Sequence, residues 1–238
     1  MCQLLLRFGL LGITALTSFS VVGQFSTPSV TLSAISEEDA KRCGMNISTP
    51  DMTDIYGKPL HFDCTANGQI KGNDYRIATM DFQYDPNSRR VSNNITFYVG
   101  GVELSKAKKL LSSDFFALND GETIDQFSGK AIHRRDKTYC GLTVTTKVKP
   151  IRGSNWTGWI AEDSYSGLPH PSCASPEEYT SRYRCVSLIV GNENMSAAMS
   201  QACLLRKSED NIQVGLSYDI FIEMAKTIRF NEGHIFEN

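Results

Sequence analysis

The chain has 238 residues, with 24 lysines and arginines against 26 aspartates and glutamates, and a formal charge of −2. Nucleic-acid-binding domains carry a strongly basic face, so this near-neutral balance excludes an electrostatic case for a nucleic-acid partner. The length suits one large domain or two small ones.

The first 23 residues have the pattern of a secretory signal peptide. Arg7 precedes an apolar run over residues 8–22, which at about fifteen residues is shorter than the roughly twenty needed to span a bilayer. Gly23 supplies a small residue for cleavage. No later segment is long and apolar enough for membrane insertion. We therefore expect a periplasmic or secreted protein, with a Ser/Thr-rich tether over residues 24–36 and one domain over residues 37–238.

Six cysteines follow the leader, and an even number in an exported chain predicts disulfides. They are Cys43, Cys64, Cys140, Cys173, Cys185 and Cys203. A zinc site would need closely spaced cysteine or histidine pairs, which the sequence lacks, so no metal is expected. We expect Cys43–Cys64 and Cys173–Cys185, because both close short segments. Cys140–Cys203 follows by elimination.

The first expected elements are a short helix and a hairpin. Ser36 is an N-cap for a helix that begins with three acidic residues and stops at Gly44. Residues 74–84 alternate, which places Ala78, Met80, Phe82 and Tyr84 on one face. Residues 93–101 supply the returning strand, after turn residues at 85–88.

The spacing of apolar residues then changes to that of a helix over residues 105–118. The lysines of this segment lie in the first turn of that helix, or further along it if the helix starts near Glu103. Residues 138–151 form the clearest strand. One of its faces is apolar, with Cys140, Leu142, Val144 and Val148, and the other carries threonines and lysines. A solvent-exposed face opposite a buried face indicates an antiparallel sheet.

More strands are expected at residues 155–161 and 182–190, with a turn at 191–194. Residues 195–207 fit either a helix or a strand, and we expect a strand in their second half. An amphipathic helix over residues 217–230 closes the chain, with Ile220, Phe221, Met224, Ala225 and Ile228 as its apolar stripe. This order predicts an α+β fold: an antiparallel sheet with two or three packed helices.

Both tryptophans, Trp156 and Trp159, lie three residues apart in one expected strand. Strand side chains alternate, so the two should point to opposite faces. Either helices cover both faces, or one tryptophan is exposed and available to a partner or ligand. The sequence leaves both alternatives open.

Beyond this strand lie Glu162 and Asp163, and then a loop over residues 166–185 that contains His170. Three prolines, at positions 169, 171 and 176, stiffen this proline-rich loop, and the expected Cys173–Cys185 bridge would close it. A paired-carboxylate hydrolase needs two acids facing one bond, which adjacent strand residues do not provide, so a second acid would have to come from elsewhere, such as Asp125 or Glu177. A stiff loop loses little entropy on binding. Binding is therefore the better interpretation of this region.

Motifs for a serine hydrolase, a phosphate loop or a dinucleotide fold are absent from the sequence, and no cofactor is expected. Our first hypothesis is an exported, non-catalytic domain that recognises a protein partner through Trp159, Tyr165 and His170, for example an envelope accessory or toxin-neutralising immunity protein. The alternative is a secreted hydrolase that uses Glu162 or Asp163 with a distant acid or His170. A third hypothesis is a structural protein whose aromatic residues all lie in the core.

Overall fold

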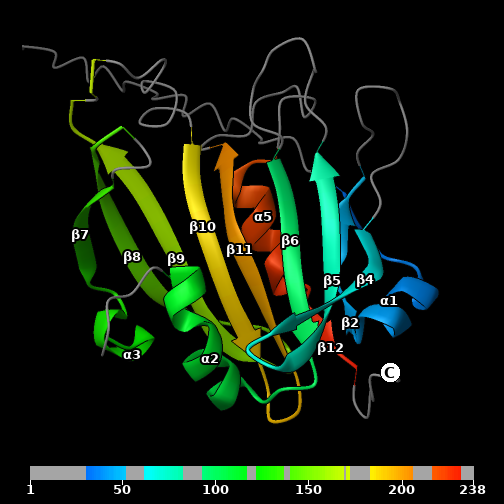
Figure 1. Ribbon diagram of the computed structural model, residues 1–238. Helices are drawn as coiled ribbons and strands as arrows, with labels where there is room; N and C mark the ends of the chain where they lie inside the picture. The colour runs from blue at the N-terminus through cyan, green and yellow to red at the C-terminus, as the bar shows by residue number, and fades with distance from the viewer. Residues whose placement is uncertain are drawn as a thin grey trace, which may run out of the picture.

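The computed structural model describes residues 31–51, 62–82, 93–116, 122–136, 140–168, 170–171, 183–205 and 216–231. Its centre is an eight-stranded sheet in which all neighbouring strands run antiparallel (Figure 1). In the order of pairing the strands are β4 (Phe62–Ile70), β5 (Asn73–Phe82), β6 (Asn93–Gly100), β11 (Ser196–Leu205), β10 (Tyr183–Gly191), β9 (Thr157–Ser166), β8 (Leu142–Arg152) and β7 (Ala131–Asp136).

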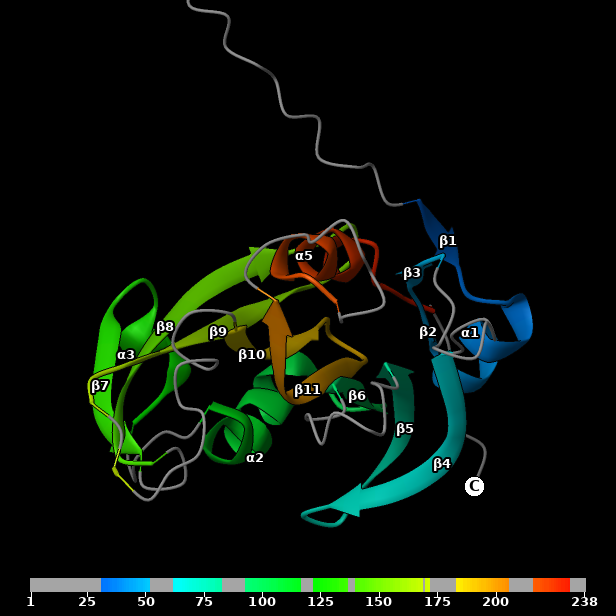
Figure 2. The same cartoon turned by 90° about the horizontal axis from the view of Figure 1, so that it is seen from above.

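Helices lie on both faces of this sheet. The described helices are α1 (Glu37–Cys43), α2 (Leu104–Phe116), α3 (Ile124–Phe127) and α5 (Tyr218–Lys226). Two small sheets pair β1 (Leu32–Ala34) with β3 (Ser48–Pro50), and β2 (Met45–Asn46) with β12 (Arg229–Phe230). Figure 2 shows α5 and α2 on opposite sides of the large sheet. We call these two sides the α5 face and the α2 face.

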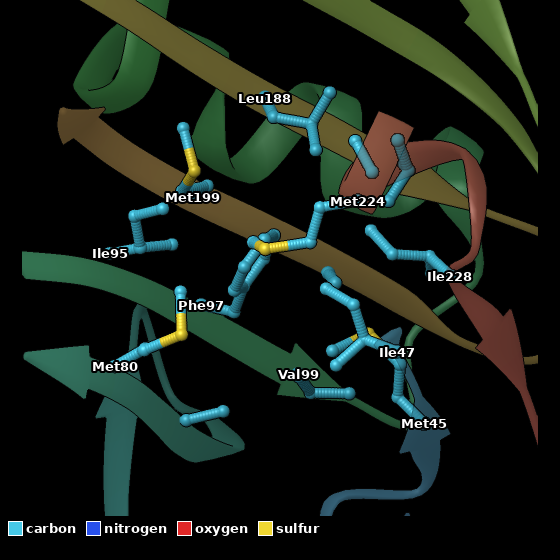
Figure 3. Close-up of a cluster of buried hydrophobic side chains, with 14 of the residues drawn as sticks. Met45, Ile47, Met80, Ile95, Phe97, Val99, Leu188, Met199, Met224 and Ile228 are labelled. Carbon is cyan, nitrogen blue, oxygen red and sulfur yellow. The ribbon is translucent and has the colours of Figure 1, made fainter. Parts of the chain in front are cut away.

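Each face has its own apolar core. On the α5 face, buried side chains of β5, β6, β10 and β11 pack against those of α5, β2 and β12. Figure 3 shows them pointing toward one another, with Phe97 and Met224 among them. On the α2 face, Ala107 and Leu111 of α2 pack against the sheet with Ile189 of β10. The central strands are therefore covered on both sides.

Several local predictions are confirmed. The Ser36 side chain accepts a hydrogen bond from the Asp39 N–H, and Gly44 ends α1 with φ of 68°. β5 pairs with β6 as a hairpin, and Ile95, Phe97 and Val99 are fully buried. In β8 the apolar residues are buried, while the lysines of the opposite face are exposed.

Other boundaries differ from those expected. The last helix ends at Lys226, so Ile228 is buried outside it and Arg229–Phe230 pairs with β2 instead. The whole of Ser196–Leu205 is one strand. Cys140 precedes β8, with φ of 62°, and therefore does not share the apolar strand face. Residues 32–34, at the end of the expected tether, form β1. The fold is α+β, but the sheet dominates it.

The described disulfides are Cys43–Cys64, as expected, and Cys185–Cys203, which corrects both Cys173–Cys185 and Cys140–Cys203. The reason is strand register: Cys185 and Cys203 lie directly opposite each other in β10 and β11, with their Cα atoms 3.8 Å apart. Cys140 is also disulfide-bonded, and Cys173 lies outside the described residues. Such bonds persist in oxidising compartments, which indicates a non-cytosolic location.

Residues 1–30, which include the expected signal peptide, are outside the described part of the chain. Within that part, no helix has the length and apolar character needed to cross a bilayer.

Candidate functional site

The two tryptophans do point to opposite faces of the sheet. Trp156 precedes β9 and belongs to the core of the α5 face, together with Ile160. Trp159 packs against the core of the α2 face, together with Ala161. The alternation expected from their spacing therefore extends through β9.

Trp156 has a structural role. Its side chain is 4% exposed, and its indole N–H donates to the Ile228 carbonyl oxygen, 2.6 Å away. The backbone at Gly153 packs so closely against the indole that a Cβ atom there would come within 2.3 Å of the ring. The ring thus fixes both the β8–β9 turn and the chain after α5.

Trp159 is only partly buried, and its ring faces the start of α2. The Lys108 ammonium lies 4.9 Å from the centroid of the Trp159 ring, within the range of a cation–π interaction. The same ammonium is 2.6 Å from an oxygen of Asp125, in α3. Lys108 is thus held between an aromatic ring and a carboxylate.

Trp159 lies in an open groove of about 590 Å³ at this end of the sheet. Three segments that are distant in sequence line it: the start of α2, the β8–β9 turn and the β10–β11 turn. We call it the Trp159 groove, and its lining residues are Glu103, Leu104, Ser105, Lys108, Arg152, Gly153, Ser154, Asn155, Trp156, Thr157, Trp159, Gly191, Asn192 and Glu193.

Hydrogen bonds connect the three walls of the groove. The Leu104 N–H donates to the Asn192 carbonyl oxygen at 2.9 Å, which joins α2 to the β10–β11 turn. The Asn192 side-chain amide donates to the Asn155 carbonyl oxygen at 3.3 Å, which joins that turn to the β8–β9 turn. The Asn155 carboxamide in turn makes two hydrogen bonds with the backbone of Phe230. The groove is therefore built into the fold.

The charges of the groove are divided between its ends. Glu103 and Glu193 are exposed, and the Leu104–Asn192 hydrogen bond brings the backbone at these two residues together. Arg152 is exposed on β8, on the opposite side of β9 from the β10–β11 turn. Within the described residues, none of these three side chains makes an ion pair.

Glu162 points to the α5 face and is 7% exposed. One of its oxygens accepts a hydrogen bond from the Tyr218 hydroxyl, and the other lies 2.7 Å from the Lys149 ammonium. Burial, and then the Glu162 carboxylate, raise the pKa of Tyr218 to about 12, although the Arg184 guanidinium 4.3 Å from the ring centroid partly opposes this. Tyr218 thus remains a proton donor to Glu162 at neutral pH.

Asp163 points to the α2 face and is 6% exposed. One carboxylate oxygen accepts a hydrogen bond from the Thr146 hydroxyl, and the other accepts one from the Gln201 amide at 2.6 Å. Glu162 and Asp163 therefore lie on opposite sides of the sheet, and each oxygen of both carboxylates has a partner. The two carboxylates therefore do not face one substrate bond, as a paired-carboxylate hydrolase would require.

Tyr165 and His170 do not share a site with Trp159. Tyr165 is 3% exposed and packs beside Leu142, Val144 and Cys185. His170 is exposed, and its backbone N–H donates to the Cys140 carbonyl oxygen at 3.0 Å. Trp159 and Tyr165 are six residues apart in β9, or about 20 Å along a strand. Trp159 therefore lies near the start of β9, Tyr165 near its end and His170 beyond it. Most of the proline-rich loop lies outside the described residues.

Sequence reasoning identified Trp159 but missed the rest of the groove. Glu103, Arg152 and Glu193 each resemble ordinary solvated charges in the sequence. They line one groove because Asn192 joins the β10–β11 turn to α2 and to the β8–β9 turn, contacts that no local pattern encodes.

The chain matches no family model, no curated protein sequence and no solved structure. The described residues also contain no cluster of three or more histidines, cysteines or acids that could hold a metal ion. The function has to be inferred from the chain's own residues.

Proposed function

We propose that the protein is an exported, non-catalytic domain that recognises a protein partner, and that the Trp159 groove is its contact surface. The observation that carries this proposal is a partly exposed tryptophan in a groove whose three walls are joined by hydrogen bonds. Tryptophan is enriched among residues that dominate binding energy. A preformed surface also reduces the ordering cost of binding.

The buried acids favour binding over catalysis. In a hydrolase, Glu162 or Asp163 would have to exchange protons with a substrate. Both residues are instead at least nine-tenths buried, and their carboxylates are hydrogen-bonded to side chains of β8, β11 or α5. The hydrolase alternative therefore has less support than the binding function.

His170 provides a competing contact surface at the other end of β9. Leu168, close to His170 in the chain, is 93% exposed. A single exposed leucine is common on soluble proteins and does not by itself indicate an interface. The groove and the His170 region can be tested separately, because they lie on different loops.

The test uses residues 24–238 as bait in three forms: wild type, Trp159→Ala and His170→Ala. Proteins captured from the native extract are identified, purified and titrated against each bait by calorimetry. We expect a partner with defined stoichiometry whose affinity falls at least tenfold for Trp159→Ala and is unchanged for His170→Ala. Thermal unfolding of each bait confirms that it is folded.

The reverse pattern, with affinity lost only in His170→Ala, would move the contact surface to the far end of β9. If no partner is captured by the wild type, the binding function is contradicted. Glycan, ester and peptide substrates would then be tested with the wild type and with Glu162→Gln.

A further inference from the structure

We propose that the Glu103–Glu193 end of the Trp159 groove receives a basic side chain of the partner, next to an apolar residue that packs on Trp159. This inference rests on the proposed function and adds the chemistry of the segment that is recognised.

This end of the groove carries two acidic residues. Glu103 and Glu193 flank the Leu104–Asn192 backbone hydrogen bond, so the backbone positions that carry these two carboxylates lie near each other. Both line the groove and are exposed. Glu103 accepts a hydrogen bond from the Ser105 hydroxyl at 2.5 Å, and within the described residues neither carboxylate has a cationic partner. Two acidic residues at one end of a groove, without a cation of the described chain beside them, favour an incoming cation.

Two cationic residues, Lys108 and Arg152, also line the groove. Lys108 cannot neutralise this end, because its ammonium is already paired with Asp125 at 2.6 Å. Arg152 lies on β8, and β9 separates it from the β10–β11 turn that carries Glu193. Neighbouring strands are about 4.8 Å apart, so roughly 10 Å separates β8 from β10. The groove is therefore acidic at one end and basic at the other.

An aromatic surface lies between these two ends. Trp159 lies there, on β9, with its ring partly exposed. An extended segment advances about 3.3 Å per residue. A segment of about five residues can therefore place a basic side chain at the glutamates, an apolar side chain on Trp159 and an acidic side chain at Arg152. Opposite charges at the two ends would also set the direction of the segment.

The chain offers a direct readout, because it has only two indole N–H groups. The indole of Trp156 is buried and bonded to Ile228, whereas that of Trp159 lies at the groove. A nitrogen–proton correlation spectrum of the labelled protein should show two indole signals. The variant Trp159→Phe assigns them by removing one signal.

The probe is the peptide Ac-Arg-Ser-Leu-Ser-Glu-NH2, and its control carries neutral citrulline in place of arginine. We expect the arginine peptide to shift the Trp159 signal and leave that of Trp156 in place. Citrulline should weaken binding to the wild type by about 1.4- to fivefold for each carboxylate contacted, the range measured for exposed ion pairs. In the double variant Glu103→Gln, Glu193→Gln, the two peptides should bind equally. In Arg152→Gln, the preference for arginine should remain.

Equal binding of both peptides to the wild type would overturn the inference, as would the absence of any Trp159 shift. A shift caused by a neutral oligosaccharide such as chitotriose, and not by the peptides, would overturn it in favour of a sugar ligand. These outcomes are separate from a failure of the proposed function. If a captured partner loses affinity for Trp159→Ala but not for the double glutamate variant, the groove binds the partner without recognising a basic side chain.

Discussion

The contact between Tyr218 and Glu162 predicts a measurable contribution to stability. Tyr218 is the first residue of α5, and its hydroxyl is the donor to one oxygen of a carboxylate whose side chain is 8% exposed. The substitution Tyr218→Phe keeps the ring and removes this donor. Lys149, which is about half exposed, stays paired with the other oxygen. Glu162 would then be left with one buried oxygen unsatisfied.

Hydrogen bonds to charged groups contribute about 1.5–3 kcal/mol. We therefore expect Tyr218→Phe to lower the free energy of unfolding by about 2 kcal/mol at pH 8, measured by urea titration with the disulfides intact. The matched control is Tyr98→Phe. Tyr98 packs edge-on against Phe115 at 5.6 Å between ring centroids, and its hydroxyl makes no hydrogen bond in the described part of the chain. A loss below about 0.5 kcal/mol for Tyr218→Phe, or one equal to the control, would refute this reasoning.

The raised pKa of Tyr218 predicts how this contribution changes with pH. Below pH 10 the hydroxyl is protonated in both the folded and the unfolded chain, so the contribution is complete. As the pH rises from 10 to about 12, the unfolded chain ionises first and stability is lost. Two pH units correspond to at most about 2.7 kcal/mol, which solvent screening at this partly exposed group reduces to about 1 kcal/mol.

The stability difference between wild type and Tyr218→Phe should therefore shrink by about 1 kcal/mol between pH 8 and pH 11.5. Effects of other titrating groups are shared by both proteins and cancel in the difference. If the difference is the same at both pH values, the Tyr218 hydroxyl is not the proton donor to Glu162.

Three further predictions concern the framework of the fold. At Gly158 a Cβ atom would lie 2.1 Å from a backbone carbonyl oxygen of β10. We therefore expect Gly158→Ala to lower the free energy of unfolding by at least about 3 kcal/mol, measured by thermal unfolding. An unchanged melting temperature would contradict this. Asn155→Ala removes two hydrogen bonds to Phe230, and should destabilise by about 2 kcal/mol and speed amide hydrogen exchange in β12. Non-reducing peptide mapping should join Cys140 to Cys173, because the other four cysteines after residue 23 pair among themselves; a Cys140–Cys203 peptide would contradict this.

Short sequence patterns correctly predicted the helices and strands whose formation depends on residues close together in the chain. Helix α1 has its own caps, Ser36 and Gly44, and both act as expected. Strand β6 alternates cleanly, and Ile95, Phe97 and Val99 are fully buried. In these segments the pattern and the final environment agree, so the sequence alone is sufficient.

Elements defined by distant pairing were less predictable. Strand β11 contains Ala, Met, Gln and Leu residues that form helices readily, but its position between β6 and β10 makes it a strand. The Cys185–Cys203 bridge follows from the same pairing, and the spacing of cysteines along the chain does not contain that information. The helix α5 ends at Lys226 because the next residues pair with β2, near the start of the domain.

The alternation of β9 separates the two roles that the sequence placed in one stretch. On the α5 face, Trp156 and Glu162 hold the chain around α5 through Ile228 and Tyr218. On the α2 face, Trp159 lies in the groove. A substitution on one face should therefore leave the other role intact. Tyr218→Phe should lower stability without changing the affinity of the groove, whereas Trp159→Ala should lower the affinity and leave the pH dependence of the Tyr218–Glu162 contact unchanged.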